Sequence, residues 1–214
     1  MKNLKLMTGI LCIILFSIQA YGQISVGGNI SYLNVFGGTG LKNIGVGFKG
    51  DYAMDERTVF SGGLNYFLPS KYSSSNYGTS YSSQTSPNQI DINVDYKISF
   101  IQLYIGGRRY FAGDYEDDFG FYGLAELGLL MSPVTAQVEK FDNTLYYTNV
   151  KDGDKETLSN FTVNFGIGIE KNMDFGYLFG DMKFIIPANQ VNGQTVSIQI
   201  PASLSLNAGV RIPF

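Results

Sequence analysis

Apolar and polar residues alternate without interruption over the last nineteen residues of the chain, from Val196 to Phe214. Every even position is apolar, whereas the odd positions carry only Ser, Gln, Pro, Asn, Gly or Arg. A period of two places successive side chains on opposite faces of a β-strand. The segment is far longer than a typical strand of about five or six residues. It therefore predicts one long strand that has an apolar face along its whole length.

Seven earlier segments alternate in the same way, at about residues 23–34, 43–53, 58–69, 89–111, 119–132, 158–171 and 175–186. Short turns near residues 55–57, 114–118 and 172–174 alternate with longer connections. No segment after residue 22 shows a sustained helical period. Antiparallel barrels with an even number of strands have short turns at one rim and longer loops at the other. The pattern predicts an all-β fold, an eight-stranded antiparallel up-and-down barrel.

Irregularities are expected at three places along these strands. In the fourth segment, apolar residues occupy even positions up to Phe100 and odd positions from Ile101 onward, which predicts a β-bulge near Ser99. Ladder bonding is expected to fail at Pro69, and Pro69 and Pro133 are expected to end their strands, because proline cannot donate to a sheet ladder. A Ser-, Tyr- and Asn-rich loop is expected at residues 71–88. Residues 133–157 could hold a hairpin extension, because Val134 begins a further alternating run.

Alternation by itself fits either a transmembrane barrel or a soluble eight-stranded barrel of the lipocalin type. The two differ in their polar face, which in a soluble barrel meets water and carries many Lys and Glu residues. Here the polar face is mainly Gly, Ser, Asn and Thr, and charged residues make up 15% of the chain against about 25% in soluble domains. These small polar residues suit a narrow lumen. The transmembrane barrel is therefore the favoured interpretation, with apolar faces toward lipid.

The N-terminus is typical of a secretory signal peptide. Lys2 and Lys5 precede an apolar run over residues 6–18, and small residues follow at Ala20 and Gly22. We expect a signal peptide at residues 1–22, cleavage near Gly22, and one barrel domain at residues 23–214.

The chain after this segment resembles the small outer-membrane β-barrel family of the OmpA/OmpX type (porin-family barrel domains) from Gram-negative bacteria. The stretch from Ala208 to Phe214 is similar to the family's C-terminal signature, and the stretch from Phe100 to Phe111 is similar to an internal strand. The second stretch departs from the family in carrying Gly106 and Gly107 where bulkier residues are common. The resemblance implies export to an outer membrane, contact with its lipid, and recognition of Phe214 by the barrel-assembly machinery.

Charged residues inside the predicted strands would point into the lumen. Eight of the charged residues in these strands are expected there, four of each sign: Lys49, Asp51, Arg108, Glu126, Glu170, Asp181, Lys183 and Arg211. Small barrels fill their interior with side chains, and buried charges persist when paired. These residues therefore predict a neutral network of ion pairs that plugs the lumen. The alternative is a thin gated pore or a proton-linked site that uses Glu126 or Asp181.

The chemistry available to the chain is restricted. It has no histidine, the usual general base and the commonest metal ligand, and its single cysteine, Cys12, lies in the predicted signal peptide. The acidic groups at residues 114–118 and 152–156 lack the spacing of an EF-hand and are interpreted as solvated turns. The mild net charge of −3 does not suit nucleic-acid binding. We expect no enzymatic activity, no cofactor, no metal and no nucleic-acid partner.

Three tyrosines in the expected loop, Tyr72, Tyr77 and Tyr81, are candidate contacts for an extracellular ligand of unknown identity, because exposed tyrosines can stack on sugars or anchor a protein. The other interpretation is a flexible, solvated loop. The predicted function is structural or adhesive, exerted through outer loops. The alternative is a narrow porin or small-solute channel.

Overall fold

The computed structural model describes residues 24–37, 40–188 and 201–214. The predicted signal peptide and residues 196–200 of the last predicted strand lie outside the described residues. Within them, no helix is both long enough and apolar enough to cross a membrane.

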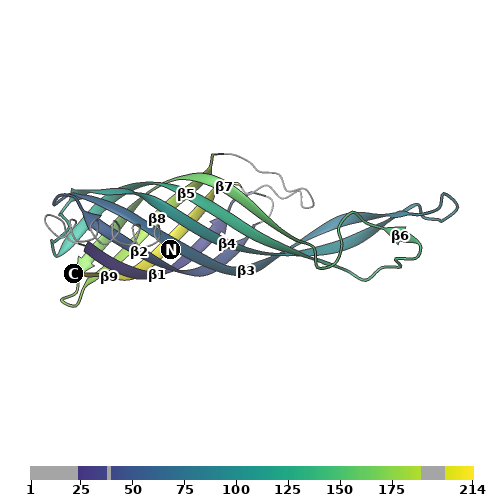
Figure 1. The fold of residues 1–214 in the computed structure, drawn as a ribbon, viewed down its shortest axis with the longest axis horizontal. Helices are drawn as coiled ribbons and strands as arrows, with labels where there is room; N and C mark the ends of the chain where they lie inside the picture. Colours follow the sequence, from purple (N-terminus) through teal and green to yellow (C-terminus); the bar gives the residue numbers. More distant parts are fainter. Residues whose placement is uncertain (1–23, 38–39, 189–200) are drawn as a thin grey trace, which may run out of the picture.

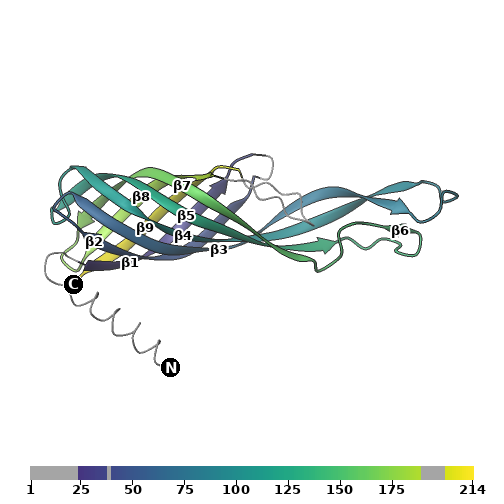
Figure 2. The same ribbon diagram turned by 45° about the horizontal axis from the view of Figure 1, so that its top comes forward.

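Antiparallel strands form a closed ring (Figures 1 and 2). The described strands are β1 (Ile24–Val35), β2 (Lys42–Ala53), β3 (Thr58–Ser80), β4 (Gln89–Ala112), β5 (Phe119–Val138), β6 (Tyr146–Tyr147), β7 (Lys155–Asn172), β8 (Tyr177–Pro187) and β9 (Ser203–Pro213). All except the two-residue β6 pair in the order β1–β2–β3–β4–β5–β7–β8–β9, and β9 pairs with β1 to close the ring. The predicted eight-stranded all-β barrel is confirmed.

One rim of the barrel carries the short turns and the C-terminus, which Figure 1 shows at the end away from the long hairpin of β3 and β4. The backbone N–H of Phe214 donates to the carbonyl of Ile24 over 2.8 Å, so the ring closes up to this rim. In the β2–β3 turn, the backbone N–H groups of Arg57 and Thr58 donate to the Asp55 carboxylate over 2.8 and 2.7 Å. The bond from Arg57 lowers the pKa of Asp55, which keeps this acceptor ionised.

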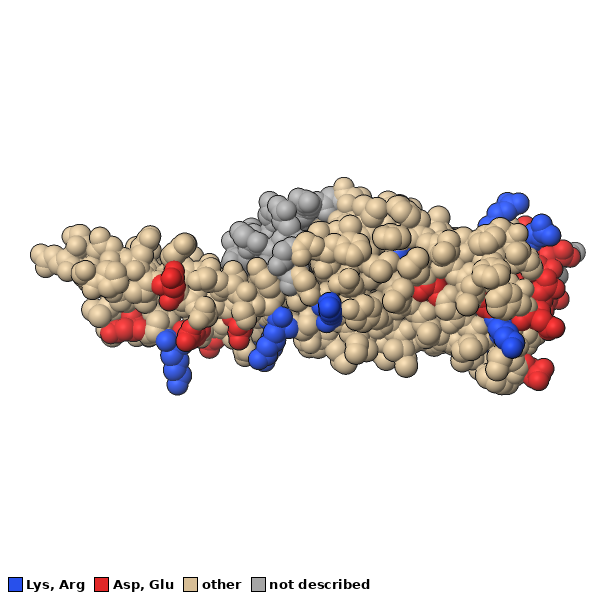
Figure 3. Space-filling model, turned by 180° about the vertical axis from the view of Figure 1, so that it is seen from behind, with Lys and Arg blue, Asp and Glu red and all other residues tan. Residues whose placement is uncertain are grey.

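The outside of the barrel is an apolar belt, as the alternation predicted. Exposed apolar side chains cover it, among them Ile44, Phe48, Leu64, Ile105, Leu127, Phe165 and Ile167. Figure 3 shows this belt mostly free of charge, between a charged rim and further charges along the hairpin. Such a belt is far too extensive for a water-facing surface. It suits hydrocarbon, and the closed ring leaves no unpaired strand edge inside the bilayer.

Four strands continue beyond the belt. The β3–β4 ladder runs on from Ser70 opposite Ile98 to Thr79 opposite Gln89, and the β5–β7 ladder reaches Thr135 opposite Lys155. We call residues 70–98 together with 133–155 the projection. Its polarity is inverted relative to the belt, because Val94, Ile98 and Ala136 are buried between the strands. Water on the outside of this part favours apolar residues on the inside.

The predicted loop at residues 71–88 is wrong for most of its length. Residues 71–80 belong to β3, and only residues 81–88 connect β3 to β4. The Ser- and Asn-rich segment has little strand propensity of its own. It becomes a strand because it pairs along residues 90–98 of β4, whose even positions are apolar or aromatic. The hairpin extension expected within residues 133–157 is confirmed.

The predicted bulge in β4 is also wrong. Even positions of β4 face the interior along its whole length, from Ile92 to Tyr110. The apolar residues change position because the surroundings change from water to hydrocarbon, while the phase of the strand stays constant. The register instead shifts in β3 between Phe67 and Ser70, at Pro69.

Prolines lie on both sides of β4 at the boundary between belt and projection. Pro69 is in the register shift of β3, and Pro133 of β5 lies where the β4–β5 pairing is interrupted, between Val134 and Met131. Each lacks a backbone donor, so each is tolerated where the ladder is already broken. The predicted failure of the ladder at Pro69 is confirmed. Both strands continue past their proline, so the prediction that Pro69 and Pro133 end strands is wrong.

Gly106, the departure noted in the internal strand, allows close approach of β5. A Cβ at this position would lie 2.2 Å from the Ala125 carbonyl oxygen. A bulkier residue would force the two strands apart at this point.

The belt makes a direct prediction for Leu127, whose side chain is 63% exposed on β5. Leu127→Arg should lower the free energy of unfolding by about 2–4 kcal/mol, the cost of placing arginine near the bilayer midplane. The measurement is reversible denaturant unfolding in lipid vesicles. Tyr77→Arg on the projection, a site exposed to water, is the control and should change stability by less than about 0.5 kcal/mol. Equal effects of the two substitutions would contradict the position of the belt.

Candidate functional site

All eight charged residues singled out in the sequence lie buried in the barrel interior, each with at most 9% of its surface exposed. They come from β2, β4, β5, β7, β8 and β9, because each strand turns its polar face inward. The structure arranges seven of them in two groups, one around Glu170 and Asp51 and the other around Glu126, and leaves Asp181 outside both.

Glu170 of β7 is the centre of the first group. Arg211 of β9 binds it with two hydrogen bonds, Nε to Oε2 at 3.1 Å and Nη2 to Oε1 at 2.6 Å. The Tyr110 hydroxyl also donates to Glu170. A planar guanidinium matches the two oxygens of a carboxylate, so this is the strongest type of ion pair in proteins.

Aromatic rings enclose Arg211 near the short-turn rim. Its guanidinium carbon lies 4.0 Å from the Tyr115 ring centre and 3.7 Å from that of Tyr177. Its Nη2 also donates to the Tyr115 carbonyl oxygen over 3.0 Å. Tyr115 belongs to the β4–β5 turn, which therefore folds inward and covers the lumen at the short-turn rim.

Arg108 of β4 connects Glu170 to Asp51. Its Nη1 lies 3.5 Å from Glu170 Oε2, and its Nη2 lies 3.1 Å from Asp51 Oδ2. The N–H groups are not aimed at these oxygens, so both contacts are ion pairs without hydrogen-bond geometry. Asp51 also faces Lys49 at 3.8 Å, and the Lys49 ammonium lies 3.5 Å from the Phe179 ring centre.

Glu126 of β5 and Lys183 of β8 form the second group. Lys183 Nζ donates to Glu126 Oε1 over 2.9 Å and lies 4.1 Å from the Tyr104 ring centre. Asn164 Nδ2 donates to the other Glu126 oxygen over 3.3 Å. Asp181, by contrast, has no ion pair within 4.0 Å among the described residues and accepts a hydrogen bond from Asn207 Nδ2 over 2.6 Å.

A chain of hydrogen-bonded, uncharged polar side chains crosses the lumen on the side of the charges that is nearer to the projection. Its donors and acceptors run in sequence through Gln102, Asn65, Asn29, Ser31 and Asn207, and the chain ends at the Asp181 carboxylate. A Cβ on Gly47 would lie 1.8 Å from Asn65 Oδ1, so a glycine is needed beside this chain. Sequence reasoning missed the network. The only signal was the recurrence of Asn and Ser on inward positions.

The lumen is filled. Beside Asp181 and Lys183 there is a cavity of about 10 Å³, which is about the space of one water molecule. Above the polar chain, buried apolar residues such as Leu33, Phe67, Phe100 and Leu130 close the interior toward the projection. Seven of the eight charges are in ion pairs and Asp181 is hydrogen-bonded, and this cavity between the carboxylates of Glu126 and Asp181 is too small for a substrate. Among the described residues, no three acidic side chains gather as a metal site would require.

The structure separates the three candidate loop tyrosines. Tyr72 is on β3, half-buried against the apolar core, with its ring 6.4 Å from that of Tyr96. Tyr77 and Tyr81 are 67% and 66% exposed. Only Tyr81 lies in the turn itself, where its ring centre is 5.1 Å from that of Tyr147 of β6.

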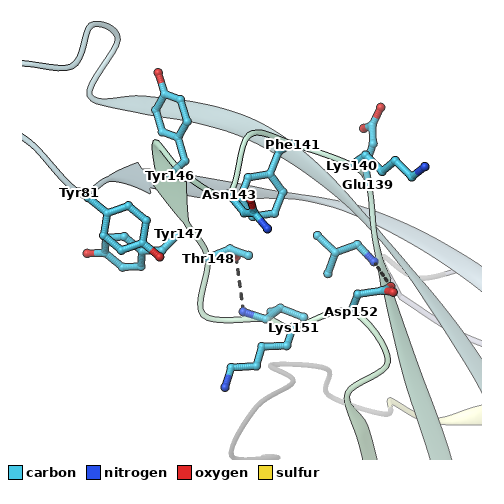
Figure 4. A pocket seen from close by; sticks show the side chains of 12 residues that line it. Tyr81, Glu139, Lys140, Phe141, Asn143, Tyr146, Tyr147, Thr148, Lys151 and Asp152 are labelled. Carbon is cyan, nitrogen blue, oxygen red and sulfur yellow. Dashed lines mark hydrogen bonds between the residues drawn. The ribbon is translucent and has the colours of Figure 1, made fainter.

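Tyr81 lines a hollow of about 540 Å³ at the outer end of the projection. The rest of its lining comes from residues 138–152, the segment that leaves β5, forms β6 and returns to β7. Figure 4 shows Tyr81 and Tyr147 on one side of the hollow, Phe141 above it, and Thr148 and Lys151 toward its lower side. Sequence reasoning missed Phe141 and Tyr147. The signal available was an aromatic-rich stretch between the apolar arms of a predicted hairpin.

Phe214, the predicted assembly signal, follows β9 at the short-turn rim and is 81% exposed. Its backbone is anchored to β1, while its ring is free of the barrel interior. The ring is therefore accessible from outside the barrel.

No protein-family model matches this sequence, and comparison with curated proteins finds no match either. Among solved structures, the fold is similar to that of Neisserial surface protein A from Neisseria, with 14% identity, a TM-score of 0.53, and coverage of 91% of this chain and 98% of the other. It is also similar to a major outer membrane protein from Thermus thermophilus, with 8% identity, a TM-score of 0.57, and coverage of 90% and 99%.

At these identities the likeness concerns the fold. The closed ring, the apolar belt and the polar, filled interior define a small transmembrane β-barrel of the outer-membrane type. The resemblance to small outer-membrane barrels is confirmed at this level, and the lipocalin-type alternative is excluded by the outward-facing apolar belt.

Removal of the Glu170 carboxylate should test the ion pairs. Glu170→Gln should lower the free energy of unfolding by about 3–5 kcal/mol, because Arg211 and Arg108 would remain buried beside a neutral amide. The measurement is denaturant unfolding in vesicles, with the exposed Glu56→Gln as the control. The loss should shrink when Arg211→Gln is also present, since the two groups act as a unit. Additive effects would show that the pair is not coupled.

Proposed function

We propose that this protein is an integral barrel of a bacterial outer membrane that has a closed interior and uses its projection as a surface-interaction structure. Export by the predicted signal peptide and assembly through Phe214 are parts of the same proposal. The barrel fold and the apolar belt support the location in an outer membrane. The projection supports the role in surface interaction.

The observation that carries the role is the apolar core of the projection, which continues the apolar cluster at the outer end of the barrel interior. Val94, Ile98, Val134 and Ala136 pack between its strands, and each is at most 1% exposed. A connection that only joins two strands needs no core and is usually short. A sheet whose apolar core continues beyond the bilayer holds its outer end in a fixed position, which lowers the entropy cost of binding a partner there.

The interior supports a structural role more than a transport role. Arg211, Glu170 and Arg108 are paired across the lumen, and the apolar cluster above them has no polar lining along which an ion could move. Catalysis has no support in the described interior, because its carboxylates are paired or hydrogen-bonded and have no adjacent substrate space.

The closed interior predicts electrically silent bilayers. Purified protein reconstituted in a planar bilayer should give no stepwise conductance. Its folded state should be verified by a mobility on a denaturing gel that changes on heating. The variant Glu126→Gln/Lys183→Met should remain silent as well, since the apolar cluster would still close the lumen. Regular conductance steps from the wild-type protein would instead support the alternative of a narrow channel.

The projection can be shortened without disturbing the belt by removing both arms together. Lys71 of β3 lies opposite Lys97 of β4 in the ladder, so residues 72–96 can be replaced by an Asn-Gly turn. Bacteria displaying the full chain should adhere to surfaces coated with cells, glycans or matrix proteins, and the shortened barrel should lose most of this adhesion. Asp117→Asn at the opposite rim is the matched control and should adhere normally. Equal adhesion by a correctly folded shortened barrel would contradict the proposed role.

A further inference from the structure

We infer that the hollow at the outer end of the projection is a binding site for a neutral saccharide, an inference that rests on the proposed surface-interaction role and names its ligand class. The hollow is an open depression with a volume of about 540 Å³, within the range of about 300–1,000 Å³ that small-molecule sites occupy. It is the place where aromatic rings, polar side chains and a fixed backbone coincide outside the bilayer.

The aromatic surface comes from two separate segments of the chain. Tyr81 follows β3, whereas Phe141 and Tyr147 belong to the segment between β5 and β7. Tyr81 and Tyr147 are 66% and 41% exposed, so their rings are available to a ligand from outside. A pyranose ring has an apolar C–H face and a rim of hydroxyl groups, and an exposed tyrosine offers a matching apolar ring with a polar tip.

The backbone around the hollow is fixed by hydrogen bonds that are already present. The N–H of Tyr81 donates to the Leu145 carbonyl over 3.0 Å, and the Tyr146 hydroxyl donates to the Pro87 carbonyl over 3.0 Å. The N–H of Val138 donates to Asp152 Oδ1 over 3.0 Å. These bonds connect both ends of the hollow to the rigid projection, so little further ordering is needed when a ligand binds.

The charges of the lining favour an uncharged ligand. Its two carboxylates are engaged, since Glu139 Oε2 accepts from Asn93 Nδ2 over 2.8 Å and Asp152 accepts from Val138. Lys140 and Lys151 balance them in number, which leaves the lining neutral as a whole. A strongly anionic ligand would gain little net attraction in such a site.

Polar groups remain that can read hydroxyl positions. Asn143 provides an amide donor and acceptor, and Lys151 an ammonium donor, both in the lining. Thr148 accepts from the Val150 N–H over 3.4 Å and keeps its O–H as a donor. Figure 4 shows Thr148 and Lys151 opposite Phe141 across the hollow. A sugar ring against the aromatic side would therefore have its hydroxyl rim near hydrogen-bonding partners.

The test uses the full chain in detergent and an array of neutral oligosaccharides built from hexose and N-acetylhexosamine units. Sulfated heparin fragments and extended peptides are included as comparators. At least one neutral oligosaccharide should bind saturably. Saturation-transfer NMR should place the strongest contacts on the sugar C–H protons, because the aromatic rings face them.

Substitutions separate stacking from folding. Tyr81→Ala and Tyr147→Ala should each weaken binding about tenfold, whereas Tyr147→Phe keeps the ring and should stay within about twofold. Tyr77→Ala is the matched control, because Tyr77 is 67% exposed on the same hairpin and does not line the hollow. The heat-dependent gel mobility of every variant should match that of the wild type.

Several results would overturn the inference. These are an absence of neutral saccharide binding, a preference for the sulfated fragments or the peptides, or binding that survives both alanine substitutions. Adhesion that still depends on the projection would in these cases leave the proposed function standing. If the wild-type chain shows neither saccharide binding nor adhesion, the proposed function is overturned as well.

Discussion

The structure depends on one constraint, which is that a polar backbone surrounded by hydrocarbon must satisfy every hydrogen bond within itself. An eight-stranded ring does so by pairing β9 with β1 along the length of both strands, as far as the bond between Phe214 and Ile24. Closure at this small size leaves an interior too narrow for bulk water. The inward side chains must therefore satisfy one another too, and the ion pairs of Glu170 and Glu126 and the amide chain through Asn65 follow from that requirement.

A second consequence appears where the hydrocarbon ends. Within the belt, apolar residues such as Ile105 face outward, whereas in the projection Ile98 faces inward on the same strand. The strand itself is continuous. Apolar residues occupy the outward positions where the surroundings are hydrocarbon and the inward positions where the surroundings are water. Pro69 and Pro133 lie at this boundary, where the ladders on both sides of β4 are interrupted. The same rule of polarity gives the barrel its lipid-facing surface and gives the projection the apolar core that stiffens it.

The contrast between the closed barrel and the water-exposed projection explains why the two candidate sites differ in how accessible their side chains are to a ligand. The titratable groups with the most unusual surroundings, Glu170 and Arg211, are enclosed by tyrosines and by each other. The aromatic groups of Tyr81 and Tyr147 are exposed at the far end of the molecule. Contacts with partners are therefore expected at the projection, while the charges of the lumen hold the barrel together.

Much of the fold follows from the sequence. Alternation at a period of two gave the ring, the sides of its strands and the eight inward charges, because the side chains of a strand have only two directions in which to point. The ion-pair partner of each charge could not be assigned in this way, because the pairing of Arg211 with Glu170 depends on the register of strands β7, β8 and β9. Residues 71–80 lack strand propensity and became a strand only by pairing with β4. The hollow formed only when Tyr81 met residues 141–147, because the tertiary structure alone brings segments so far apart in the chain to the same end of a sheet.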